Sequence, residues 1–281
     1  MEDLLKIEYT NNISGLLLNP FMVKITISES NKLVTKNRYI SYLVGTSETT
    51  RTSRFNEWLA GLIDGDGSLL ISKKGNPSCE ITVNLYDEKM LRIIQNQLGG
   101  NIKSRSGVKA VRWRLHNNNG IIDLIQRING NIRNTNRLKQ LHHLCSKLNL
   151  PIINPIPLTL NNNWFAGYFD ADGTISYSFK NNNPQLYIGV TNKLLQDVEH
   201  FNLLGGKIYY DRTQQGCYKW QIHSQEEIEK FTKLIISFSH KSHRLKLIPQ
   251  FYYLKSLKSY SYDISSANYK NWLKFENKWK S

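Results

Sequence analysis

The chain contains the segment WLAGLIDGDG at residues 58–67 and a near copy, WFAGYFDADG, at residues 164–173. Each segment is an apolar run of helical character that ends in a carboxylate and a glycine. Their last acids, Asp66 and Asp172, lie 106 residues apart. We expect a chain that builds the same corner twice to bring the two corners together. Two carboxylates at one such junction predict a site for divalent cations.

Small residues recur within both segments at a spacing of one helical turn. Gly61 and Gly65 are four residues apart, and Gly167 and Ala171 repeat this spacing. Small residues one turn apart allow two helix backbones to approach closely, so we expect the two segments to pack side by side. The alternative is that each Asp-Gly pair only ends a helix and begins a turn. Its occurrence in both halves of a basic chain favours the cation site.

Other stretches repeat at an offset of 106 or 107 residues, which indicates duplication of a unit of roughly 100 residues. Residues 98–103 match 204–209, residues 112–116 match 219–223, and residues 136–139 match 243–246. The segment PIINPIP at residues 151–157 is typical of a stiff connection. The predicted organisation is an N-terminal extension (1–53), a first repeat (54–150), a Pro-rich linker (151–160) and a second repeat with a C-terminal tail (161–281).

Strand signals follow each acidic segment. In the second repeat Ile175, Tyr177 and Phe179 alternate with polar residues, and the first repeat alternates in the same way at 80–85 and 112–116. This period predicts sheets with one buried face and one polar face. Helical periodicity predicts helices near residues 87–97, 118–129, 135–148, 193–203, 225–236 and 243–257. We therefore expect an α/β fold (α+β) of two tandem repeats, each reading α-β-β-α-β-β-α.

The net charge of the chain indicates which class of partner it binds. Its 281 residues include 37 Lys and Arg against 22 Asp and Glu, a net charge of +15. This excess predicts a polyanionic partner, DNA or RNA, although an ordinary basic enzyme has the same composition. Three scattered cysteines without a Cys-x-x-Cys pair argue against a zinc site and fit a reducing compartment. No apolar run approaches the roughly 20 residues of a membrane span, so no membrane partner is expected.

The N-terminal extension has no counterpart in the second half. Residues 21–27 predict a short strand, because Val23, Ile25 and Ile27 alternate with polar residues, and residues 28–32 predict a turn. Residues 46–53 are polar throughout and are typical of a flexible lead-in. We expect little regular structure here. Two origins stay open: a remnant of an upstream reading frame, or an addition that contacts DNA.

The acidic segments resemble the motifs of the LAGLIDADG homing endonucleases, in the single-chain form that carries two motifs. The resemblance covers roughly residues 54–260. It implies a monomer in which two sheets form a pseudo-two-fold saddle over double-stranded DNA, with the motif helices packed at the centre. It also implies hydrolysis of phosphodiester bonds in both strands of a long, asymmetric target. The implied cofactor is Mg²⁺, or another divalent cation such as Mn²⁺ or Ca²⁺ in its place.

By resemblance, the last acid of each motif is a catalytic metal ligand, which assigns this role to Asp66 and Asp172. Asp64 and Asp170 match the earlier acid of the motif, whose contact with metal is less certain. The metal would polarise the scissile phosphate and activate water.

The family also places a basic or amide side chain before the last helix of each repeat. Arg133 and Lys241 lie in the matching neighbourhoods and are the candidate basic catalytic residues. They do not align with each other, since Lys241 lies opposite Asn134. Arg137 and Arg244 do align, and we consider helix-surface or phosphate-contacting roles for them.

The polar faces of the sheets are the candidate DNA-binding surface. A two-stranded ribbon fits the major groove, where mixed donors read base edges and Lys and Arg neutralise phosphates. A solvated outer face would have the same polar pattern. The predicted DNA-binding residues are Ser68, Ser72, Lys74, Lys103, Arg105, Arg112 and Arg114 in the first repeat, and Thr174, Ser176, Ser178, Lys180, Lys207, Tyr209, Lys219 and Gln221 in the second.

The sequence therefore favours an intron-encoded, site-specific DNA endonuclease. One alternative is an RNA maturase that helps its host intron to fold, since the basic surface suits RNA as well as DNA. Another is a non-catalytic DNA-binding regulator on the same scaffold. The intact acids favour cleavage over both. Family habit and the abundance of Asn and Lys place the protein in the mitochondrial matrix or another organelle.

Overall fold

The computed structural model describes residues 6–9, 22–29, 32–39, 47–213, 216–241 and 243–280. The chain divides into two compact units, Met1–Ser53 and Arg54–Ser281. In the first unit, three strands form an antiparallel sheet in the order β1-β2-β3. These strands are β1 (Lys6–Tyr9), β2 (Met22–Glu29) and β3 (Lys32–Tyr39).

The expectation of little regular structure before residue 54 is wrong. The strand expected at 21–27 is β2, and the turn expected at 28–32 includes the strand ends Glu29 and Lys32. The polar lead-in expected at 46–53 instead begins helix α1 (Ser47–Asp66). Extending an existing helix costs less than nucleating one, so the apolar part of α1 extends into this polar stretch. Residues 21, 30, 31 and 46 of these expectations lie outside the described residues.

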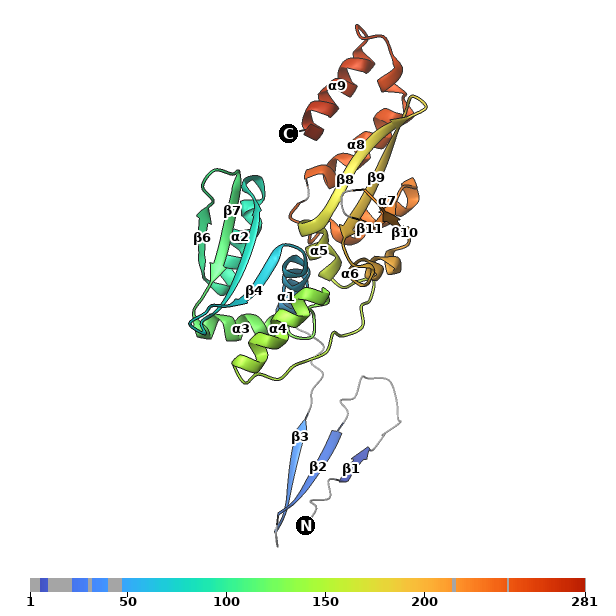
Figure 1. Cartoon of the computed structure of the whole chain (residues 1–281). Helices are drawn as coiled ribbons and strands as arrows, with labels where there is room; N and C mark the ends of the chain where they lie inside the picture. Colours follow the sequence, from blue (N-terminus) through green and yellow to red (C-terminus); the bar gives the residue numbers. More distant parts are fainter. Residues whose placement is uncertain are drawn as a thin grey trace. The chain divides into compact units, whose positions relative to one another are not determined.

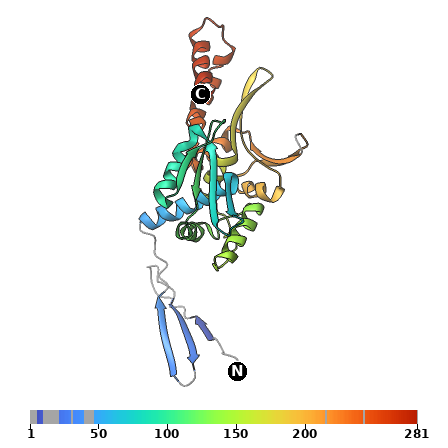
Figure 2. The same cartoon turned by 60° about the vertical axis from the view of Figure 1, so that its left-hand side comes forward.

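The second unit contains two halves that share a core order of a helix, two strands, a helical segment, two strands and two helices (Figures 1 and 2). The first half comprises α1, β4 (Gly67–Ile71), β5 (Pro77–Asn84), η1 (Leu85–Asp87), α2 (Glu88–Leu98), β6 (Asn101–Ser104), β7 (Ala110–Leu115), α3 (Asn118–Ile128) and α4 (Thr135–Lys147). The second half comprises α5 (Trp164–Asp172), β8 (Gly173–Lys180), β9 (Asn183–Asn192), α6 (Leu195–Val198), η2 (Glu199–Leu204), β10 (Lys207–Asp211), β11 (Cys217–Ile222), α7 (Gln225–Ile235), α8 (His243–Ser256), η3 (Ser259–Ser261) and α9 (Ala267–Lys280). The sheets have the orders β4-β5-β7-β6 and β10-β11-β9-β8. The α/β fold in two repeated halves is thus confirmed.

Two details of the expected order differ. The helices expected at 118–129, 135–148, 225–236 and 243–257 are confirmed as α3, α4, α7 and α8, so each repeat ends in two helices where the summary order has one, and α9 has no counterpart in the first half. The helix expected at 193–203 is the four-residue α6 followed by the 3-10 helix η2. Within this segment the carboxylate of Asp197, 1% exposed, accepts hydrogen bonds from Asn134 Nδ2 (3.1 Å) and Thr135 N (2.8 Å). These tertiary bonds hold α6 to the start of α4 and compete with a regular helix.

The strand registers sort the side chains onto two faces. In the first sheet the row Leu69, Cys79 and Leu115 is buried, while the adjacent row Ser68, Glu80 and Arg114 lies on the opposite face. In the second sheet the row Ile175, Ile188 and Ile222 is buried, and the adjacent row Thr174, Gly189 and Gln221 lies opposite. This alternation is the one expected for a sheet packed on one side only.

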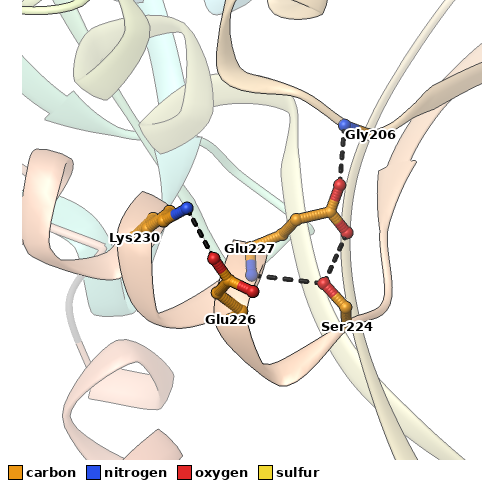
Figure 3. A network of polar contacts seen from close by, with 5 residues as sticks. All are labelled: Gly206, Ser224, Glu226, Glu227 and Lys230. Carbon is orange, nitrogen blue, oxygen red and sulfur yellow. Dashed lines mark hydrogen bonds and ion pairs between the residues drawn. The ribbon is translucent and has the colours of Figure 1, made fainter.

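A hydrogen-bonded cap fixes the start of α7 (Figure 3). The Ser224 hydroxyl accepts from the backbone N–H of Glu227 (3.2 Å) and donates to the Glu227 carboxylate (2.7 Å), which forms a capping box. The same carboxylate accepts from the backbone N–H of Gly206 (3.1 Å), just before β10. The cap therefore ties the second sheet to the helix that covers it.

The segment between the halves has no helix or strand at residues 151–159. Hydrogen bonds nevertheless hold it to the first half: the side-chain Nδ2 of Asn129 donates to Pro151 O (2.7 Å), and the backbone N–H of Ile156 donates to Gly130 O (2.9 Å). Within the described part of the chain, no helix combines the length and the apolar character that a membrane span requires.

Candidate active site

Helices α1 and α5 touch through their backbones, between the two sheets (Figure 1). A Cβ atom on Gly61 would collide with the carbonyl oxygen of Trp164, and one on Gly167 would collide with that of Trp58. The two contacts are reciprocal, so the helices cross at this pair of glycines. The expected side-by-side packing of the two motif segments is confirmed, and it depends on the absence of side chains at the crossing.

Further along the pair, the structure brings the two last acids close together. Gly65 faces Ala171, and a Cβ on Gly65 would lie 3.4 Å from Asp172 Oδ2. The carboxylate of Asp172 therefore lies beside the end of α1, where Asp66 is the final residue. Strands β4 and β8 begin at the next residues, so both acids stand at helix-to-strand junctions, and both are half-buried.

Burial and mutual repulsion make this pair costly as two free anions. Burial raises the pKa of Asp66 to about 6, and the charge of Asp172 adds to the rise. Burial also raises the pKa of Asp172, while Lys241 and Arg137 act in the opposite direction. A bound divalent cation would remove the repulsion and restore both carboxylates to their ionised form.

A cavity of about 360 Å³ lies beside Asp66 and includes Asn84, Asp87 and Lys241 in its lining. The charge of Asp87 contributes to the raised pKa of Asp66, and burial raises the pKa of Asp87 itself. Asp87 was not anticipated from the sequence. It belongs to no motif, and the fold alone brings the end of η1 near the end of α1.

The donor set fits a hard divalent cation. Among the described residues, no group of three or more His, Cys, Asp or Glu side chains is arranged to hold a metal ion. The protein therefore offers the two carboxylates of Asp66 and Asp172 rather than a complete cage. Mg²⁺ is commonly bound by one or two carboxylates, with substrate phosphates and water as its other ligands.

The earlier acids of the motifs lie elsewhere, 1% exposed each. Trp58 Nε1 donates to Asp170 Oδ2 (2.9 Å), and Trp164 Nε1 donates to Asp64 Oδ2 (2.7 Å). Each tryptophan belongs to one motif helix and each aspartate to the other. Asp64 and Asp170 thus form two reciprocal bonds across the helix pair, and burial raises the pKa of Asp64 to about 7.

The same buried acids hold the turns that precede α4 in the first half and α8 in the second. Asp64 accepts from the backbone N–H of Arg133 (2.8 Å). Asp170 accepts from the backbone N–H groups of His240 (2.8 Å) and Lys241 (3.0 Å), and from the hydroxyl of Ser239 (2.5 Å). Because each acid holds the turn of its own half and a tryptophan of the other, it couples the helix crossing to the candidate basic residues.

The structure separates the two candidate basic residues. Lys241 Nζ donates to the carbonyl oxygen of Ala171 (3.1 Å), which places the ammonium group beside Asp172. The guanidinium of Arg133 instead donates to the carbonyl oxygens of Asn131 and Ile156 and lies 5.6 Å from the centre of the Trp164 ring. Arg133 is thus directed toward the linker, away from the carboxylate pair.

The polar face of the first sheet carries an acid that the sequence pattern did not single out. Glu80 binds both Arg112 (2.7 Å) and Arg114 (3.0 Å). A hollow of about 740 Å³ on this sheet is lined by residues that include Ser72, Lys103, Arg105, Arg112 and Arg114. Three expected positions lie outside the strands, since Ser72 and Lys74 follow the end of β4 at Ile71 and Arg105 follows the end of β6 at Ser104.

The polar face of the second sheet is the counterpart of this surface. Ser176 and Ser178 alternate with Tyr177, whose ring packs against Phe251 and Trp272 on the helical side of the sheet. Lys219 forms an ion pair with Asp211 at 2.5 Å. The remaining expected residues lie on the strands as follows: Thr174 and Lys180 on β8, Lys207 and Tyr209 on β10, and Gln221 on β11.

Two stretches of the chain match known families: residues 59–147 match "LAGLIDADG endonuclease", and residues 159–235 match "LAGLIDADG-like domain". The "Intron-encoded RNA maturase bI4" of Saccharomyces cerevisiae is 48% identical over 96% of this chain. The "Probable intron-encoded endonuclease aI2" of Debaryomyces hansenii is 46% identical over 86% of it. The chain spans 42% and 45% of the lengths of these two relatives.

The chain is also similar to a third relative and to a solved structure. The "Intron-encoded DNA endonuclease ai2a" of Dictyostelium discoideum is 33% identical over 81% of this chain and 75% of its own length. The structure described as "I-SmaMI bound to uncleaved DNA target in the presence of Calcium ions" aligns with a TM-score of 0.56 at 16% identity. The alignment covers 79% of this chain and 97% of that one, which shows a shared fold.

Proposed function

The chain belongs to the LAGLIDADG endonuclease family, and we propose that it is an intron-encoded, site-specific endonuclease that cuts both strands of a long, asymmetric DNA target. The observation that carries this proposal is the half-buried pair Asp66 and Asp172, one from each half, at the centre of two sheets with polar faces. A binding module without chemistry has no need of two like charges held close together at one junction.

In the proposed reaction the residues of the chain bind, orient and neutralise. Asp66 and Asp172 hold the cation, which is Mg²⁺ with Mn²⁺ or Ca²⁺ as substitutes, and which supplies polarisation of the phosphate and activation of water when bound. Lys241, beside Asp172, stabilises negative charge that develops on the phosphate. The polar sheet faces bind double-stranded DNA through the residues predicted above, with Arg112, Arg114 and Lys219 released from their ion pairs to do so.

We assign residues 1–53 as an extension, 54–150 and 161–281 as the repeats and 151–160 as the linker. Since one chain supplies both halves of the site, the protein acts as a monomer. The named relatives are intron-encoded, which supports a mitochondrial or other organellar location.

A second candidate function is an intron RNA maturase. Residues 243–280 contain eight Lys or Arg and two acids. Helices α8 and α9 of this segment cover the side of β8 opposite to Ser176 and Ser178 (Figures 1 and 2). This basic region is therefore separate from the polar sheet face. The 48% identity to a relative named as an RNA maturase supports the same candidate.

Cleavage of DNA that contains the uninterrupted host gene tests the proposal. The wild-type protein and the variants Asp66→Asn and Asp172→Asn are incubated with this DNA and Mg²⁺. Discrete double-strand cuts that disappear in both variants are expected. Specific binding without cuts would instead indicate the DNA-binding regulator. Tight binding of intron RNA, with neither specific DNA binding nor cuts, would indicate the maturase.

A further inference from the structure

The β8–β9 hairpin extends beyond the rest of its sheet. Strand β9 pairs with β11 through residues 188–192. Its residues 183–187 pair with residues 176–180 of β8 and, in the described part of this sheet, with no other strand. We call these two paired stretches the outer ribbon. The equivalent stretch of the first sheet is shorter, since β5 pairs with β4 but not with β7 at Pro77 and Ser78 alone.

The outer ribbon presents polar side chains on one face. Residues directly opposite each other in an antiparallel pair share a face, so Ser178 and Gln185 lie together, and Lys180 continues the same row. All three side chains are exposed. Strand residues and the phosphates of one DNA strand have the same spacing, about 3.4 Å. The ribbon therefore lengthens the polar face of the second sheet by several base pairs.

Helix α9 packs against the apolar face of the outer ribbon (Figures 1 and 2). The ring centre of Tyr177 lies 5.8 Å from that of Trp272 and 5.5 Å from that of Trp279. Phe179 lies 6.1 Å from Trp272. Both tryptophans are buried, at 2% and 5% exposure. Because a two-stranded hairpin is marginally stable at best without such packing, α9 is the element that supports the ribbon.

Hydrogen bonds fix this contact at the middle and at the tip of the ribbon. The hydroxyl of Tyr177 donates to Glu276 Oε1 (2.7 Å) on α9. The hydroxyl of Tyr260, in η3, donates to Asn183 Oδ1 (2.6 Å) at the start of β9. Hydrogen bonds are directional, so these two restrict the position of the hairpin more closely than ring packing alone.

The two halves use their aligned arginines differently. Arg244 donates to the carbonyl oxygens of Ile175 (3.0 Å) in β8 and Trp279 (3.2 Å) in α9, and so joins the strand to the helix. Arg137 instead donates to Gln140 (3.2 Å) within α4. The described residues of the first half include no equivalent of α9. The support is therefore a property of the second half.

We propose that α9 is a brace that makes the second half read the outer base pairs of its half of the DNA target more strictly than the first half reads its own. This inference rests on the proposed function, through its DNA target. An unsupported ribbon can bend away from a wrong base pair and lose little affinity. A braced ribbon holds Ser178, Lys180 and Gln185 in place, so a wrong base pair leaves hydrogen-bonding groups without partners. Helix α9 is thus a positioning element.

Competition binding in Ca²⁺ tests the brace. Duplexes in which each base pair of the host-gene target is replaced in turn compete with the intact duplex for the full-length protein. The positions at which Lys180→Ala loses discrimination mark the end of the target that the ribbon contacts. At that end we expect a replacement to weaken wild-type binding by about tenfold, and at the other end by less.

Two variants remove parts of the brace. Trp272→Ala should reduce the tenfold penalty to about twofold at the outer base pairs of the marked end, and should leave the penalties elsewhere unchanged. Glu276→Ala keeps the aromatic packing and removes the bond to Tyr177. It should relax the same base pairs to a smaller extent, and it keeps the test decisive if Trp272→Ala does not fold.

Phe231→Leu is the matched control. Phe231, on α7, is 2% exposed and packs against Phe169 and Trp220 in the core of the same half. This variant should lower the melting temperature without changing the pattern of penalties. Equal wild-type penalties at both ends, or uniform relaxation by Trp272→Ala and Glu276→Ala, would overturn the brace while the nuclease function stands. A wild type that binds host-gene DNA no more tightly than unrelated DNA would remove the proposed function as well.

Discussion

Trp58 on α1 donates a 2.9 Å hydrogen bond to Asp170 on α5, and Trp164 at the start of α5 returns the bond to Asp64. The two acids occupy equivalent positions, but their surroundings differ. In Asp170, Oδ1 accepts from the Ser239 hydroxyl and the Lys241 backbone N–H. Its Oδ2 accepts from Trp58 Nε1 and the His240 backbone N–H. The bonds to Asp64 from Trp164 and Arg133 both reach Oδ2.

Substitution by asparagine should separate these two acids. In Asp170→Asn an NH₂ group faces two donors, so we expect a loss of about 3 kcal/mol in the free energy of unfolding. In Asp64→Asn the amide oxygen can keep both bonds to Oδ2, and we expect a loss of about 1 kcal/mol. Urea unfolding followed by circular dichroism measures both values. Equal losses would contradict the difference in hydrogen bonding.

The glycine crossing should tolerate no side chain. Gly61→Ala or Gly167→Ala places a methyl group against a backbone carbonyl of the other helix, and backbone cannot move aside as a side chain can. We expect each variant to lose about 3 kcal/mol or more of stability. Gly99→Ala is the control, because it has a φ of 71° but nothing within 4 Å of the added methyl. Its cost should be about 1 kcal/mol, and a similar cost at all three positions would contradict a backbone-level crossing.

The carboxylate pair should destabilise the metal-free protein in a pH-dependent way. Both pKa values are raised, so the ionised forms oppose folding above the folded-state pKa, and this penalty fades as the pH falls through about 6. Asp172→Asn should therefore stabilise the protein by about 1 kcal/mol near pH 8 in EDTA, and by much less near pH 5. Mg²⁺ should raise the melting temperature of the wild type but not of the variant. Melting curves at the two pH values, with and without Mg²⁺, check this. Stabilisation of the variant that is equal at both pH values would count against a repulsive pair.

Glu80 should restrain the DNA affinity of the first sheet. It neutralises Arg112 and Arg114, so Glu80→Gln leaves both arginines free for phosphate. We expect tighter non-specific DNA binding and a plot of log affinity against log salt that is steeper by about one unit. Glu226→Gln is the matched control, since Glu226 pairs with Lys230 on the exposed surface of α7 (Figure 3). Fluorescence anisotropy with a non-specific duplex at several salt concentrations measures the slopes, and identical slopes for the two variants would contradict the restraint.

The elements that could be predicted are those whose signal is local and repeated. The motif helices, the alternating strands and the approach of Asp66 to Asp172 all follow from patterns that occur twice, and duplication makes a weak pattern readable. The N-terminal sheet was missed because β3, with the sequence KLVTKNRY, lacks an apolar alternation. Its strand depends on pairing with β2, and strand propensity depends on such context.

The site residues that were missed are those that depend on tertiary placement. Asp87 comes near Asp66 only through the path of β5 and η1, and Glu80 meets its two arginines only across the register of β5 and β7. The separation of Arg133 from Lys241 has a similar cause. The first half directs its arginine to the linker carbonyl of Ile156, and no pattern within one repeat encodes that contact.

The linker described above also bears on how the two halves have come to differ. Because the linker joins the two halves, their association is intramolecular rather than bimolecular. Its effective concentration is on the order of millimolar for a short connection. In a dimer of two identical subunits, every amino-acid substitution would be present in both halves of the site. Within one chain, each half meets a single fixed neighbour. Asn134 and Lys241, or Arg137 and Arg244, can then diverge independently, and under the proposed function the DNA target need not be a palindrome.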